Sequence, residues 1–101
     1  MRFMLNIRMP HAKFNAAVKD GSAGAKLQRI LAAMKPQAIY FSEQNGLRRA
    51  VAIVDLADAS GIPALAEPWF LTFEAEVEFH VVMTPEDLAK GGLDKLGKEW
   101  A

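Results

Sequence analysis

Polar side chains on one face of a predicted strand are the residues of this chain best suited to chemistry. The segment Glu76–Met83 alternates polar and apolar residues, so Glu76, Glu78 and His80 point to the same side. Imidazole can move a proton near neutral pH, and two carboxylates at this spacing lie within reach of acid–base geometry. His80 is therefore the first catalytic candidate, and Glu78 is the carboxylate that can orient it.

The N-terminal strand brings basic and amide groups to the same surface. Met1–Pro10 also alternates, which places Asn6 and Arg8 on the face opposite its main apolar residues. An arginine beside an acidic strand is a counter-ion or, alternatively, a clamp for an anionic ligand. With Tyr40 from a neighbouring hairpin, these groups have the mixed character of a small-ligand site. We therefore expect Asn6, Arg8, Tyr40 and Glu76 to bind a ligand.

Each candidate also has an ordinary structural interpretation. His80 can simply be hydrogen-bonded across the sheet, and Glu76 and Glu78 can form a solvated or salt-bridged face. Tyr40 in a hairpin is typical of amphipathic packing. The chemical and the structural interpretations differ in whether this face lines a cavity.

Composition excludes several other kinds of site. The chain has no cysteine and only two histidines, so there is no thiolate nucleophile and no recognised metal-ligand pattern. No phosphate-binding loop or nucleophile elbow is present, and we expect neither a metal nor a cofactor. Twelve basic residues balance twelve acidic residues, which gives no electrostatic footprint for nucleic acid or anionic lipid.

The hydrophobic pattern also bears on location. No apolar run reaches the ~18 residues of a membrane span. The alternating N-terminal stretch differs from the continuous apolar core of a signal peptide. We expect a cytoplasmic protein with no membrane partner.

The first element that positions these residues is a strand that ends at Pro10. A helical region with an interruption follows it. One apolar stripe of that region ends at Val18 and the next starts at Leu27, ~900° or half a turn out of phase at ~100° per residue. One straight helix cannot bury both stripes, so we expect a break at 21–24, where two glycines lie.

A hairpin follows, centred on Asn45-Gly46, which tolerates the positive φ angles of a type I′ turn. A two-residue turn pairs Glu43 with Arg48 and Tyr40 with Val51, and the opposite charges of the first pair support this register. Both faces of the hairpin are largely apolar near the middle. A second layer should therefore cover the face that the helices leave free.

The second half of the chain predicts a helix over Asp58–Phe73, with Ser60 as its cap and a kink or break at Pro68. The alternating strand comes next, and Thr84 to Asp87 is a strong helix start. The remaining residues, about 85–101, are predicted to form a helical tail that packs against another surface.

This order predicts an α+β domain over residues 1–101 with ferredoxin-like βαββαβ topology and an antiparallel sheet of order 4-1-3-2. A hydrophobic fraction of 51% is high for so small a monomer. We therefore expect a homodimer.

The topology, length and doubly apolar hairpin resemble the dimeric α+β-barrel proteins, which include muconolactone isomerases and antibiotic-biosynthesis monooxygenases. The segments 62–71 (IPALAEPWFL) and 77–88 (VEFHVVMTPEDL) also resemble a family of short bacterial proteins without an assigned function. The resemblance implies a barrel closed by two sheets. No catalytic motif of the named enzymes matches, so it implies no catalytic residue.

Three functions fit these observations. The first is a homodimeric barrel that binds a small organic ligand in a polar cavity between its sheet and its partner. The second is a cofactor-independent isomerase or monooxygenase-like enzyme that uses His80 as acid or base. The third is a structural or interaction module without a ligand, whose cavity is only a packed dimer core.

Overall fold

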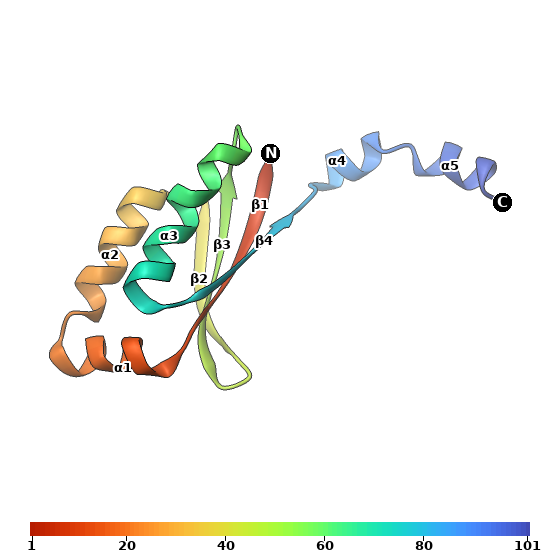
Figure 1. Ribbon diagram of the computed structural model, residues 1–101. Helices are drawn as coiled ribbons and strands as arrows, with labels where there is room; N and C mark the ends of the chain where they lie inside the picture. The colour runs from red at the N-terminus through yellow and green to blue at the C-terminus, as the bar shows by residue number, and fades with distance from the viewer.

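A computed structural model describes residues 1–101 as an α+β fold, in which a four-stranded antiparallel sheet has helices on one face (Figure 1). The chain order is β1 (Arg2–Met9), α1 (His11–Asp20), α2 (Ala23–Met34), β2 (Ala38–Gln44), β3 (Leu47–Asp55), a 3-10 turn (Ala59–Gly61), α3 (Ile62–Phe73), β4 (Glu76–Val81), α4 (Pro85–Lys90) and α5 (Leu93–Glu99).

The sheet confirms the predicted strand order, since β2-β3-β1-β4 is the order 4-1-3-2 read from its other edge. The predicted βαββαβ order is wrong in its helices. Two helices separate β1 from β2, and two more follow β4. Gly21 divides the first helical region into two helices, and the segment after β4, which the six-element scheme does not contain, forms two more helices separated by Gly91 and Gly92.

The predicted break in the first helical region is confirmed. Helix α1 ends at Asp20 and α2 begins at Ala23, and Gly21 between them has a φ of 80°. Glycine adopts this left-handed conformation at no steric cost. The break lets Phe14 of α1 and Ile30 of α2 both point into the core, although their stripes are out of phase along the sequence.

The hairpin has the predicted turn and register. Asn45 and Gly46 both have positive φ, and Glu43 lies opposite Arg48. These two charged side chains do not pair with each other, however. Arg48 Nη1 donates instead to Asn15 Oδ1 at 2.8 Å, and Glu43 Oε2 accepts from the Gly46 backbone N–H at 3.1 Å. The turn geometry therefore sets the register without help from an ion pair.

Helix α3 differs from its prediction at its start, and Pro68 does not break it. Its start is preceded by a 3-10 turn, where the Asp58 side chain accepts from the Ser60 N–H, so Ser60 is not the cap. The helix also runs unbroken through Pro68. Trp69 and Phe73, both fully buried, follow this proline. Their packing offsets the hydrogen bond that proline removes, because tertiary burial outweighs local propensity.

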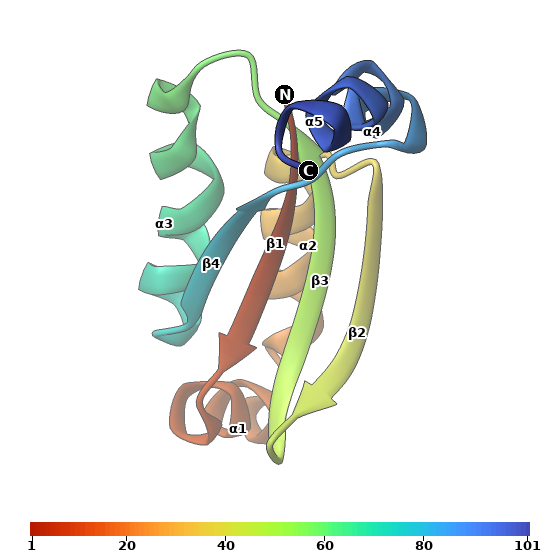
Figure 2. The ribbon, with the colours of Figure 1, turned by 90° about the vertical axis from the view of Figure 1, so that its right-hand side faces the viewer.

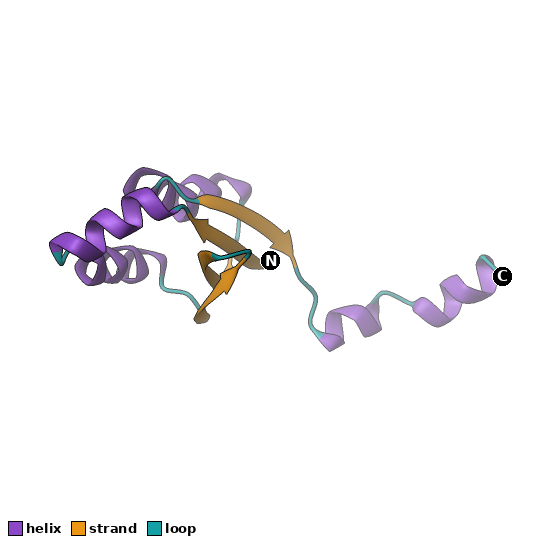
Figure 3. Cartoon of the chain, turned by 90° about the horizontal axis from the view of Figure 1, so that it is seen from below, coloured by secondary structure: helices purple, strands orange, loops and turns teal.

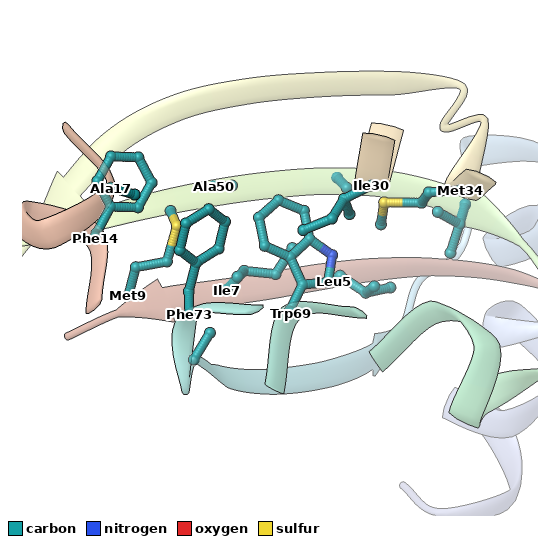
Figure 4. Packing of buried hydrophobic residues seen from close by; sticks show 13 residues of the cluster. Leu5, Ile7, Met9, Phe14, Ala17, Ile30, Met34, Ala50, Trp69 and Phe73 are labelled. Carbon is teal, nitrogen blue, oxygen red and sulfur yellow. The ribbon is translucent and has the colours of Figure 1, made fainter. Parts of the chain in front are cut away.

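The hydrophobic core lies between the sheet and helices α1–α3 (Figure 4). Alternate residues of β1 and β3 form its floor, and large side chains of the helices fill it from above. The main buried side chains are Leu5, Ile7, Met9, Phe14, Ile30, Met34, Val54, Trp69 and Phe73. Every one of them precedes β4, so the last two helices contribute nothing to this core.

The C-terminal arm, residues 82–101, stands away from the rest of the molecule (Figure 1). Its first helix, α4, has a complete capping box between Thr84 and Asp87. Every residue from Pro85 to Ala101 is exposed, and the molecule measures 60 × 29 × 19 Å. The expected docking of the tail therefore does not occur on its own chain.

None of the helices is both long enough and apolar enough to cross a lipid bilayer.

Candidate functional site

The candidate site lies on the face of the sheet that helices α1–α3 leave uncovered, here called the open face. Figure 2 shows this face toward the viewer. The strand register arranges its side chains in rows that run across the four strands from β2 through β3 and β1 to β4. The three central rows are Ala38, Ile53, Met4, His80; Tyr40, Val51, Asn6, Glu78; and Ser42, Arg49, Arg8, Glu76.

Asn6 is the centre of a hydrogen-bond network on the open face. Its side-chain Nδ2 donates to Glu78 Oε1 at 3.0 Å and to Gln44 Oε1 at 3.2 Å, and its Oδ1 accepts from Arg49 Nε. Asn6 is only 5% exposed and is the sole buried polar residue of the chain. Its full set of partners fits the rule that a buried amide must satisfy its donors and acceptor.

Arg8 holds the two carboxylates of β4. Its Nη1 donates to Glu78 Oε1 at 2.6 Å, and its Nε and Nη2 donate to Glu76 Oε2 at 3.0 and 2.9 Å. Hydrogen bonds from Asn6 and from Arg8 lower the pKa of Glu78 below its ordinary value. Hydrogen bonds to Glu76 and then Glu78 raise the pKa of Arg8. Arg8 is thus the counter-ion of both carboxylates, and its guanidinium is already engaged.

Arg49 is a functional candidate that the sequence reasoning did not select. Its Nε is bound to Asn6, but its two terminal nitrogens have no hydrogen-bond partner and it forms no ion pair. The side chain is half-buried between Ser42 and Arg8 in its row. The signal was present in the sequence, since alternation from Val51 places Arg49 on the open face.

His80 and Tyr40 are not brought together. His80 is on the edge strand β4 and Tyr40 on the opposite edge strand β2, and both are exposed. Neither side chain makes a hydrogen bond within the chain, and His80 lies opposite Met4. A groove of about 800 Å³ lies between α2 and α3, on the other side of the sheet, and His80 does not line it. The single chain thus forms no hydrogen bond between His80 and the carboxylate of Glu78, which the sequence analysis expects to orient it.

Apolar side chains border the polar network. Val51 shares a row with Asn6, while Met4 and Ile53 share the next row, and all three are half-buried. Tyr40, in the row of Val51, is 67% exposed. The open face therefore combines one available guanidinium, a rigid amide network and a surface that favours contact with hydrocarbon or aromatic groups.

No three or more histidine, aspartate or glutamate side chains gather in a way that could hold a metal ion.

The class of protein that the geometry defines is an α+β fold with a four-stranded antiparallel sheet, helices on one face and a polar network on the other. The chain matches no protein-family model, and no curated protein is significantly similar to it. Function must therefore be argued from the open face itself.

Proposed function

We propose that this protein binds a small organic carboxylate on its open face, which a second copy covers to form a homodimer of the dimeric α+β-barrel type. The observation on which the proposal depends is the Arg49 guanidinium. It is fixed at Nε by Asn6, while its terminal nitrogens have no partner.

The chemistry of Arg49 favours a carboxylate. A guanidinium is planar, and its two outward N–H groups match the two oxygens of a carboxylate in a bidentate pair. Because Asn6 holds Nε, the fork is pre-organised and loses little freedom on binding. Arg8 cannot serve in the same way, since Glu76 and Glu78 occupy it.

The body of the ligand follows from the neighbouring side chains. Val51 offers apolar contact in the row next to Arg49, Ile53 and Met4 extend this apolar surface by one more row, and Tyr40 offers a ring with a hydroxyl. A compact aromatic or branched aliphatic acid has this combination of one anionic end and one apolar body.

A second copy supplies the missing cover. Two four-stranded sheets that face each other form an eight-stranded barrel, whose interior is wide enough to hold one small ligand, and this turns an open surface into an enclosed space. Removing water lowers the local dielectric and strengthens the pair between Arg49 and a carboxylate. Arg8 pairs with both Glu76 and Glu78, so these three side chains together carry one net negative charge. The Glu76 carboxylate lies on the edge strand with 65% of its side chain exposed, so it can keep contact with water at the rim of the interface.

The enzymatic alternative has less support. An isomerase or monooxygenase-like mechanism would need a carboxylate that orients His80. Glu78 Oε1 accepts from Asn6 and Arg8, and neither Glu78 nor Glu76 forms a hydrogen bond with His80. The purely structural alternative predicts a face filled by partner side chains, and ligand titration separates it from the proposal.

The test is an NMR titration of the full chain with benzoate and the branched acid isovalerate, using benzamide as the uncharged probe. We expect both acids to shift the amide signals of Asn6, Arg49 and Val51, with binding at least tenfold weaker for benzamide. Arg49→Gln should lose benzoate binding, whereas Arg29→Gln, on the helical side, should retain it. Equal binding of benzamide, or unchanged benzoate binding by Arg49→Gln, would rule the proposal out.

A further inference from the structure

We infer that the C-terminal arm of each copy clasps the other copy, with α5 packed on the helix-side surface of the partner's β2. This inference rests on the proposed dimer and adds to it the element that holds the dimer together. It starts from residues 82–101, which contribute nothing to the core of their own chain.

The arm needs a partner because its helices are too short to be stable alone. Helices α4 and α5 have six and seven residues, whereas isolated helices below ~12–15 residues are marginal in water. No packing against the body compensates for this, since all residues from Pro85 onward are exposed. A surface outside the chain must therefore supply the burial that stabilises them.

The arm also presents the apolar stripe that such docking requires. Leu93, Leu96 and Trp100 follow the i, i+3, i+7 spacing of one helix side. They are 60%, 42% and 84% exposed. The remaining positions of α5 are charged residues and one glycine, so only one side of this helix favours burial.

The direction of the arm points to a second copy. The arm leaves the end of β4 on the side of the sheet opposite helices α1–α3, as Figures 1 and 3 both show. This is the side of the open face. A second copy that covers the open face must therefore lie alongside the arm, and an isologous dimer repeats the contact twice.

The helix side of β2 has no helix packed on it and is the position where the arm of a partner can bind. Phe41 of β2 points to the helix side of the sheet but is 52% exposed. Figure 2 shows why, because α2 lies behind β1 and β3, α3 lies beside β4, and β2 has no helix behind it. An amphipathic helix placed there would complete the layer and cover Phe41 together with its half-buried neighbour Ile39.

Symmetry brings the arm to that position. A two-fold axis parallel to the strands sets β4 of one copy opposite β2 of the other. It also keeps corresponding ends of the two sheets together. Ala38, at the beginning of β2, is in the same row as His80, near the end of β4. The arm that follows β4 therefore emerges beside the first residues of the partner's β2.

The first experiment compares two full-length double variants by sedimentation equilibrium. Leu93→Gln with Leu96→Gln removes the apolar stripe, and we expect at least a ~100-fold weaker dimer because four buried leucines are lost per dimer. Asp94→Gln with Lys98→Gln alters the same helix without changing its net charge and should dimerise like the parent. A leucine variant that dimerises as tightly as the parent overturns the clasp but leaves the dimer. A monomeric parent chain overturns both.

The second experiment locates the arm. The chain has no native cysteine, so single-cysteine variants report one position each. Gln37→Cys, at the beginning of β2, mixed with Lys95→Cys should give a cross-linked dimer with a short bismaleimide. Lys19→Cys, at the end of α1, mixed with Lys95→Cys should not. Preferential cross-linking through Lys19→Cys would overturn the placement on β2.

Discussion

Asn6 and Glu78 face each other across β1 and β4, and the Asn6 Nδ2 donates to Glu78 Oε1 at 3.0 Å. The same amide accepts from Arg49 Nε. The neutral side chain of Asn6 thus links Glu78, on the acidic edge strand β4, to the guanidinium of Arg49. This link fixes the position of Arg49 without neutralising it, which is the property that a carboxylate site needs.

The network should contribute to stability through Asn6. Asn6→Ala removes a buried amide and leaves Arg49 Nε and one acceptor of Gln44 without that partner. We expect a loss of ~1–3 kcal/mol in the free energy of unfolding, measured with urea. Ser42→Ala, an exposed position on the same face, should stay within ~0.5 kcal/mol of the parent. Equal stability of Asn6→Ala and the parent would show that the network does not contribute to the free energy of unfolding.

The lowered pKa of Glu78 predicts a pH dependence. Its hydrogen bonds to Asn6 and Arg8 favour the ionised form in the folded state, relative to an ordinary value of 4.5. The resulting stabilisation is present above pH 4.5 and disappears as the pH falls through the folded pKa. The difference in unfolding free energy between the parent and Glu78→Gln should therefore be larger at pH 7 than at ~pH 3. A difference that is constant or grows toward low pH contradicts this assignment.

Two glycines should respond to alanine in opposite directions. Gly46 has a φ of 82° in the hairpin turn, so Gly46→Ala should destabilise the fold by ~1 kcal/mol. Gly24 lies in α2 with no atom within 4 Å of an added Cβ, and Gly24→Ala should stabilise it by ~0.5–1 kcal/mol. Thermal unfolding of both variants checks the pair. A more stable Gly46→Ala would mean that the turn is not type I′.

The elements that could be predicted from the sequence are those that local chemistry determines. Asn45-Gly46 determined a turn and a register because the turn needs positive φ at both positions. The phase change between Val18 and Leu27 located the helix break for a similar reason. Pro68 failed as a breaker, since its effect depends on how Trp69 and Phe73 pack. That packing depends on residues distant in the sequence.

For the site, alternation assigned residues to the open face but not their partners. Arg8 and Arg49 look alike in the sequence, yet Arg8 lies beside β4 and is paired, while Arg49 lies one strand further away. The pairing of β1 with both β3 and β4 decides which arginine is available. Strand register between distant segments has no local signal in the sequence. For this reason Arg8 was predicted to bind a ligand and Arg49 was not.

The central claim is that a second copy covers the open face, and sedimentation equilibrium at micromolar concentrations tests it most directly. The parent chain should have twice the monomer mass of 11.1 kDa. Val51→Lys places a charge in the middle of the open face and should give a monomer, whereas Leu71→Lys, exposed on α3, should remain a dimer. A parent that stays at the monomer mass, or a Val51→Lys variant that dimerises as the parent does, would contradict the account.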